Sequence, residues 1–349
     1  MMTFKSGMLT MTHDIKHDIS LKTGDHMKLS KLILGMTLAT GMMAAAHAQT
    51  VLKIGYATTA TSHYGVGSTA FCDDIEKGTQ NRYKCQHFPS SALGGEREMI
   101  EAVQLGTLDL VNTSTGPVGN FVPEVKIVDI PFLFRDYDHA RKVMDGPIGQ
   151  DILAKFPSKD IIALGWTENG FRHMTNNKRD IVKPADAAGL KMRTMENKVH
   201  MDGYRTFGIL PTPMAFPELF GALQQGTVDG QENPIPVILA SKFAQVQKHL
   251  SLTGHVYSPA LLLLSPKVWN KLSDADKKVF TDAAKKAGVA QRKKVNDDEN
   301  SGIAQLEKDG MKVTKVVDGQ AFRDALKPAY AAYAKEFGAE NIKRIQDIK

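Results

Sequence analysis

Three side chains that could bind a ligand stand together past the middle of the chain: Gln231, Glu232 and Asn233. Residues 211–236 around them predict a loop, a short helix, a tight turn and a strand that the polar run brings to an end. Open α/β sheets bind ligands beyond the carboxyl ends of their strands, so these groups predict hydrogen bonds to a polar ligand. The competing interpretation is that Asp229 and Asn233 only form a turn.

Two other polar segments are predicted to follow strands. Residues 57–63 end in His63, at the start of a helix that extends to about residue 77, and such a helix start favours anions. Residues 112–120 place the Thr113 hydroxyl beyond a strand that covers residues 108–111. Capping of the helix is the alternative role for His63, and bonding to the loop backbone is the alternative for Thr113.

The chain contains a repeated pattern that indicates two similar domains. Residues 102–109 read AVQLGTLD and residues 222–229 read ALQQGTVD, and each segment ends an amphipathic helix at glycine and leads into a strand. We therefore expect two α/β domains, each with its own sheet and with a ligand cleft between them. Closure of two domains around a ligand is the hinge behaviour of periplasmic binding proteins.

The remaining pattern is helical over much of the chain. We expect helices over residues 137–156, 243–250 and 274–309, and a long apolar strand over residues 256–264. The last helix, at 1.5 Å per residue, would extend about 50 Å and would cross both domains.

Composition limits the function classes. At 349 residues the chain is long enough for two domains, and 42% hydrophobic and 23% charged residues are typical of a globular protein. The formal charge of +6 is mild and its lysines and arginines are spread along the chain. Nucleic-acid binding would require a continuous basic face, so we expect no nucleic-acid partner.

The amino terminus predicts export. Residues 27–48 combine two lysines, an apolar stretch and an A-x-A cleavage site at Ala48, which are the parts of a signal peptide. The stretch is shorter than the roughly 20 residues of a membrane span. Residues 1–26 precede a plausible start at Met27, and we interpret them as an overextended start. The mature protein would begin near Gln49 in the periplasm.

Cys72 and Cys85 are the two cysteines of the chain. In an oxidising compartment this pair predicts a disulfide that joins the first helix to the following strand. Two free thiols are the alternative, and no residues at ligand spacing predict a metal site.

No sequence motif for catalysis is present. The chain lacks the P-loop, the G-x-G-x-x-G fingerprint, the G-x-S-x-G elbow and the H-E-x-x-H zinc motif. Binding, without a cofactor, is therefore favoured over chemistry. A secreted hydrolase that uses Glu96 and Glu232 as paired carboxylates is the enzymatic alternative.

Several segments together resemble one family of binding proteins. They are residues 88–98, 130–132, 189–193, 211–216 and 222–234, and the likeness extends over about residues 50–340. The chain is similar to the dicarboxylate-type (DctP) solute-binding proteins of tripartite ATP-independent periplasmic (TRAP) transporters. The resemblance implies an α/β two-domain periplasmic binding fold of type II, with domain I at 49–170 plus about 258–298 and domain II at 171–257 plus about 299–349.

The resemblance also implies which residues meet the ligand. Arg193 matches the arginine that pairs with the ligand carboxylate, and a guanidinium suits that task because it forms two parallel hydrogen bonds. A surface salt bridge is its alternative role. The other implied ligand contacts are Arg172, Asn233, Phe216, Glu96, Thr113 and His63.

The implied function is capture of a small organic acid, such as a C4-dicarboxylate or a sugar acid, and its delivery to a TRAP permease driven by an ion gradient. One ligand carboxylate or two would fit the arginines. The implied protein is a monomer. A ligand sensor that docks to a membrane receptor is the alternative within this class.

Overall fold

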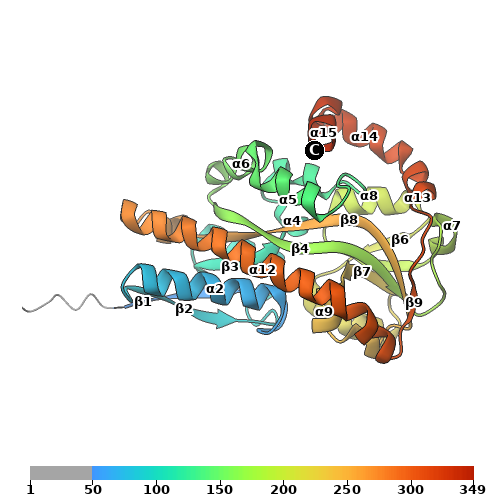
Figure 1. Cartoon of the computed structure of the whole chain (residues 1–349), viewed down its shortest axis with the longest axis horizontal. Helices are drawn as coiled ribbons and strands as arrows, with labels where there is room; N and C mark the ends of the chain where they lie inside the picture. Colours follow the sequence, from blue (N-terminus) through green and yellow to red (C-terminus); the bar gives the residue numbers. More distant parts are fainter. Residues whose placement is uncertain (1–48) are drawn as a thin grey trace, which may run out of the picture. The chain divides into compact units, whose positions relative to one another are not determined.

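The computed structural model describes residues 49–349 (Figure 1). The proposed signal peptide and start lie outside these residues. The strands are β1 (Thr50–Gly55), β2 (Tyr83–Phe88), β3 (Leu110–Ser114), β4 (Ile162–Asn176), β5 (Lys191–Thr194), β6 (Leu210–Pro213), β7 (Gly230–Pro234), β8 (His249–Leu264) and β9 (Lys312–Thr314). The α-helices are α2 (His63–Gly78), α3 (Glu96–Leu105), α4 (Thr115–Val118), α5 (Tyr137–Asp145), α6 (Pro147–Leu153), α7 (Pro184–Ala187), α8 (Lys198–Thr206), α9 (Phe216–Gln225), α10 (Ile235–Ala240), α11 (Pro266–Trp269), α12 (Asp274–Lys308), α13 (Gly319–Ala325), α14 (Lys327–Phe337) and α15 (Ala339–Gln346). Short 3-10 helices are η2 (Pro123–Asp129), η3 (Phe156–Lys159) and η4 (Phe243–Gln245).

All nine strands of the described chain belong to one sheet, so the expectation of a separate sheet in each half is wrong. The order is β2-β1-β3-β8-β4-β7-β5-β6, and β9 pairs with β8. β4 and β8 are antiparallel and are 15 and 16 residues long. They continue the hydrogen-bond ladder from one half of the molecule to the other, which joins the two halves into a single sheet.

The repeated sequence pattern does correspond to a repeated structure. β1, α3 and β3 have their counterparts in β5, α9 and β7, and β1 pairs parallel with β3 as β5 does with β7. Helices α3 and α9 both end at a glycine with left-handed backbone, Gly106 at φ 70° and Gly226 at φ 72°. A residue with a side chain adopts this conformation at a cost, which explains both glycines.

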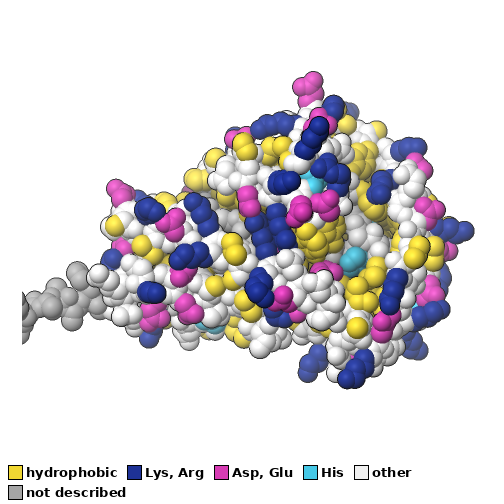
Figure 2. Space-filling view, viewed as in Figure 1, with side chains coloured by type: hydrophobic (Ala, Val, Ile, Leu, Met, Phe, Trp, Pro, Cys, Tyr) yellow, Lys and Arg dark blue, Asp and Glu magenta, His cyan; other side chains and the backbone are white. Residues whose placement is uncertain are grey.

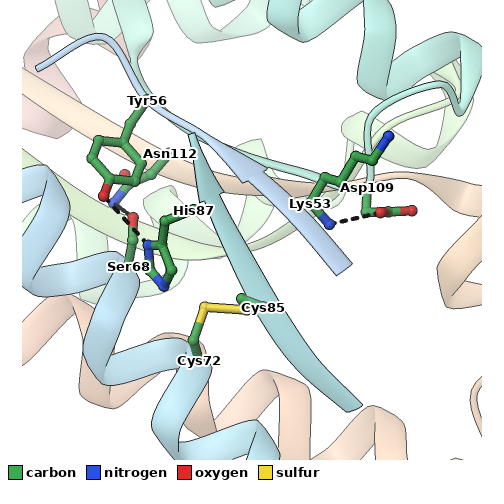
Figure 3. Close-up of a disulfide and its surroundings, with 8 residues drawn as sticks. All are labelled: Lys53, Tyr56, Ser68, Cys72, Cys85, His87, Asp109 and Asn112. Carbon is green, nitrogen blue, oxygen red and sulfur yellow. Dashed lines mark hydrogen bonds between the residues drawn. A yellow bond between two sulfur atoms is a disulfide. The ribbon is translucent and has the colours of Figure 1, made fainter. Parts of the chain in front are cut away.

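The aspartate at the end of each copy of the repeated pattern accepts a hydrogen bond from a backbone N–H of the neighbouring strand. Asp109 accepts a hydrogen bond from the backbone N–H of Lys53 at 2.8 Å, which Figure 3 shows, and Asp229 accepts one from Lys191 at 2.9 Å. Each bond links the residue before one strand, β3 or β7, to the parallel strand beside it, β1 or β5. The proposed role of Asp229 as a mere turn former is therefore incomplete.

The core lies on both faces of the sheet. Alternate residues of β8 belong to different hydrophobic clusters: Leu261 and Leu263 to one, Leu262 and Leu264 to the other. This follows from the two-residue period of a strand. A third cluster, around Leu219, surrounds α9 and α10. Helices cover both faces, as in the expected α/β class.

The long helix α12 has the predicted extent of 35 residues and lies across both halves (Figure 1). It contacts α2 and β4, and farther along it contacts α10. A Cβ at Gly288 would come within 2.6 Å of the Trp166 carbonyl oxygen, and one at Gly302 within 2.5 Å of Leu239. Glycine at these two positions allows α12 to pack closely against both halves of the molecule. No helix within residues 49–349 is long and apolar enough to cross a membrane.

Three local predictions are wrong for identifiable reasons. The expected helix over 137–156 is divided at Gly146–Pro147 into α5 and α6, because proline starts a new helix more readily than it continues one. The expected helix over 243–250 is a single 3-10 turn, η4, after which β8 begins at His249. The polar run Gly230–Pro234, expected to follow a strand, is itself strand β7 and is buried throughout.

The predicted disulfide between Cys72 and Cys85 is present and joins α2 to β2 (Figure 3). The two cysteines are 13 residues apart in sequence. The cross-link fixes the first helix on the edge strand of the sheet, where β2 has a neighbour on one side only.

We expect the double replacement Cys72→Ser and Cys85→Ser to lower the free energy of unfolding by about 3 kcal/mol, because the disulfide restricts the unfolded chain. Urea unfolding followed by circular dichroism measures this loss. The native protein treated with reductant should show the same loss. A double variant as stable as the oxidised protein would contradict the prediction.

Candidate functional site

A narrow cavity lies between the repeated halves of the molecule, close to the starts of α2 and α3 on one side and to β5, β7 and α9 on the other. Its lining residues are Ala57, Thr58, Tyr64, Glu96, Ser114, Asn169, Arg193, Met195, Phe216, Asn233 and Val237. A second small cavity shares Glu96, Arg193 and Phe216. Of the seven ligand contacts expected from the sequence, Glu96, Arg193, Phe216 and Asn233 line the first cavity.

Arg193 is a buried cation in the wall of this cavity. Its Nε and Nη2 donate to the carbonyl oxygen of Met214 at 3.0 and 2.8 Å, and its guanidinium lies 5.8 Å from the centre of the Phe216 ring. Its Nη1 is buried and has no hydrogen-bond partner among residues 49–349, and no acid there forms an ion pair with it. Burial, with the nearby charge of Arg172, lowers the pKa of Arg193 to about 10, so it remains charged at neutral pH.

Arg172 lies behind the cavity wall and is neutralised within the protein. Its Nε and Nη2 donate to the carboxylate of Glu232, and Nη2 also donates to Asn233 Oδ1 at 3.2 Å. The Tyr204 hydroxyl donates to the same carboxylate at 3.0 Å. Burial raises the pKa of Glu232, but the charge of Arg172 and the hydrogen bonds from His255 and Arg172 outweigh burial and hold the pKa well below its usual range. The charge of Arg172 is therefore paired within the protein, although its Nη1, like that of Arg193, has no hydrogen-bond partner among residues 49–349.

Asn233 is held in place by its neighbours on both sides. Its Oδ1 accepts from Arg172, and its Nδ2 donates to Gln231 Oε1 at 2.5 Å. Gln231 in turn donates to Thr175 on β4 at 2.9 Å. The side chain that faces the cavity is thus fixed in orientation by the layer beneath it, which is what a precise hydrogen-bonding site requires.

Glu96 and Thr113 form one unit on the other wall. Thr113 Oγ1, the Ser114 N–H and Ser114 Oγ all donate to Glu96 Oε1, at 2.8, 3.0 and 3.2 Å. Ser114 lines the cavity, whereas Thr113 supports Glu96 from beside it. Thr113 lies within β3, not in the loop that was expected after the strand.

His63 lies beside the cavity rather than in its lining. Its Nε2 is 3.1 Å from Asn169 Oδ1, and burial lowers the pKa of His63 to about 3, so it is neutral. Its neighbours Tyr64 and Asn169 line the cavity instead. The Tyr64 hydroxyl is buried and has no hydrogen-bond partner in the described part of the chain. Sequence reasoning missed both residues, although His63 is the chain neighbour of Tyr64.

Asp129 is a buried carboxyl that connects segments on both sides of the site. It accepts hydrogen bonds from Thr115 Oγ1 at 2.5 Å and from Asn197 Nδ2 at 2.7 Å. Burial raises the pKa of Asp129 to about 7, against the lowering effect of these bonds.

The raised pKa of Asp129 predicts that the free energy of unfolding falls as the pH rises. The pKa of Asp129 in the folded protein lies above the unfolded value of about 3.9, so its contribution is complete below pH ~4 and is lost as the pH rises through about 7. We expect Asp129→Asn to reduce the loss of unfolding free energy between about pH 5 and 8. Urea unfolding at several pH values measures it. Replacement of the exposed Asp138 by Asn is the control, and an unchanged pH dependence in Asp129→Asn would refute the prediction.

A two-domain α/β fold with a polar cavity between its halves and an unpaired buried cation in the wall defines a solute-binding protein of the periplasmic type. Residues 54–336 match the family described as bacterial extracellular solute-binding protein, family 7 (DctP), and the chain belongs to this family.

Known relatives support the same assignment. A TRAP periplasmic solute-binding protein from Polaromonas sp. JS666, solved bound to D-erythronate, is 76% identical with a TM-score of 0.86, over 86% of this chain and 99% of that chain. A second one, from Bordetella bronchiseptica, has density interpreted as pantoate and is 56% identical, with a TM-score of 0.85 over 86% and 100% of the two chains. A solute-binding protein of Verminephrobacter eiseniae is 53% identical over 92% of this chain and 96% of its own.

The family fixes the class of function. TRAP solute-binding proteins are periplasmic, bind small acids and work with membrane permeases, and they are not enzymes. The hydrolase alternative is therefore wrong. The structure gives a physical reason as well, because Glu232 is bound to Arg172 and does not line the cavity with Glu96.

Proposed function

We propose that the protein captures a small hydroxylated organic acid in the periplasm, with Arg193 as the carboxylate clamp, and delivers it to an ion-gradient-driven TRAP permease. The observation that carries this proposal is the buried, unpaired Nη1 of Arg193 in the cavity wall. A buried cation is costly without a counter-ion, so a ligand carboxylate is the natural partner. Asn233 and Phe216 would orient the ligand beside it.

The domain boundaries are part of the proposal. Domain I comprises residues 49–170 with about 258–298, and domain II comprises 171–257 with about 299–349. Gly170 and Ser258 are partners in the pairing of β4 and β8, so both proposed crossings lie at the same rung of the ladder. We also propose that residues 27–48 are removed on export and that the mature protein is a monomer.

A ligand panel tests the proposal. The purified protein is heated with erythronate, pantoate, succinate and an uncharged polyol of similar size. A ligand at 100 times its dissociation constant stabilises the folded state by about 2.7 kcal/mol, so at least one acid should raise the melting temperature by several degrees. The polyol should not. Failure of every acid, confirmed by calorimetry, would contradict the proposed function.

A further inference from the structure

We infer that Glu96 restricts the ligand to hydroxylated monocarboxylates: its fixed negative charge excludes a second carboxylate and its free oxygen accepts hydrogen bonds from ligand hydroxyls. This inference rests on the proposed function of the same cavity. It concerns which acids fit, a question that the presence of two arginines leaves open.

The position of Glu96 is set by the fold. It is the first residue of α3, and negative charge is favoured at the start of a helix. All three hydrogen bonds that it receives within residues 49–349 end on Oε1, so Oε2 is left for a ligand. No lysine, arginine or histidine of the described chain forms an ion pair with it. Hydrogen bonds therefore fix the Glu96 carboxylate at the cavity, and no ion pair neutralises its charge.

The cavity lining offers one cation to a ligand carboxylate, and its one acid would repel a second carboxylate. Arg193 and Glu96 are the charged residues in its lining. Behind the wall, Arg172 is matched by Glu232, and at the adjoining cavity Arg97 lies 3.6 Å from Glu196. One ligand carboxylate would satisfy Arg193. A second would find no free cation in this wall and would face Glu96, and charges repel strongly where water is excluded.

The other polar groups of the lining suit hydroxyls. An ionised carboxylate is an acceptor only, so Glu96 requires a ligand donor. The unpartnered Tyr64 hydroxyl can donate or accept, and Asn169 and Ser114 lie in the same lining. A short acid with hydroxyl groups along its chain could donate to Glu96 and also bond to these groups, whereas an ionised, unsubstituted dicarboxylate has no hydrogen to donate to Glu96.

The test compares Glu96→Gln with a matched control, Glu98→Gln, which makes the same change of charge on the exposed side of the same helix turn. Calorimetric titrations use erythronate and succinate. We expect the native protein and Glu98→Gln to prefer erythronate by about 100-fold or more. In Glu96→Gln we expect erythronate to bind roughly tenfold more weakly and succinate roughly tenfold more tightly.

The outcomes separate this inference from the proposed function. If the native protein binds erythronate but Glu96→Gln keeps the native preference over succinate, the inference is wrong and the proposed function stands. Native preference for succinate would also overturn the inference. If the native protein binds neither these acids nor others of the panel, the proposed function fails. The melting temperatures of the ligand-free variants verify that each one is folded.

Discussion

Replacing Arg193 with alanine is expected to weaken binding of the ligand acid by about 2–5 kcal/mol, which is roughly 30-fold to several-thousand-fold in the dissociation constant. The variant would lack both the positive charge that neutralises the ligand carboxylate and the donor Nη1, which has no partner within residues 49–349. Isothermal titration calorimetry measures the loss. The variant also loses the two hydrogen bonds to Met214, so the melting temperature of the ligand-free variant is measured to verify that it is folded.

Two further variants sharpen this test. Arg193→Lys keeps the charge but cannot form the two parallel bonds, so its affinity should lie between those of the native protein and Arg193→Ala. Arg205→Ala removes an exposed arginine whose partner is Asp202, and it should bind normally. An Arg193→Ala variant within twofold of the native affinity would exclude the carboxylate clamp.

Replacing Glu232 with alanine is expected to destabilise the fold by roughly 3–5 kcal/mol, because it leaves Arg172 buried without its counter-ion. The Arg172 and Glu232 side chains are both fully buried, so water cannot compensate. Urea unfolding measures the change. Asp202→Asn breaks exposed ion pairs with Lys198 and Arg205 and should cost less than about 1 kcal/mol. Equal effects of the two variants would contradict the assignment.

The same pair predicts a loss of stability in acid. The pKa of Glu232 is depressed in the folded protein, so its stabilising contribution is complete above the unfolded value and is lost as the pH falls through the folded one. Glu232→Gln should therefore lose less stability than the native protein when both are moved from neutral to acidic pH. Urea midpoints at several pH values measure the difference, and equal losses would contradict the prediction.

Helices whose ends are marked by glycine were predictable from the sequence. Helices α3 and α9 end at Gly106 and Gly226, as the repeated pattern predicted. Strand β7 was not predictable in the same way, because its sequence GQENP has poor strand propensity. Its polar side chains are satisfied by partners on β4, such as Thr175 and Arg172, which are distant in sequence.

The candidate site shows the same division. The family resemblance indicated Arg193, Asn233, Phe216 and Glu96, and all four line one cavity. Charge pairing was beyond the sequence, since Arg172 and Glu232 are 60 residues apart. The number of arginines alone therefore does not show that the charge of Arg172 is already paired with Glu232.

The charged side chains of the surface are mixed in sign. On the face shown in Figure 2, basic and acidic side chains are interspersed, and the basic residues of α12 pair with acids such as Asp297 and Asp298 one helical turn away. This pattern is typical of a solvated helix face.

The shared pair of long strands limits how the two halves can move. A slip of one residue between β4 and β8 would turn every side chain to the opposite face, so the halves can bend and twist but cannot slide. The ladder is already interrupted between Glu168 and Gly170 and again between Arg172 and Met174, next to the cavity. Such a pair of strands would act as a flexible hinge with a fixed register, so that the same residues of the two halves would meet at every closure.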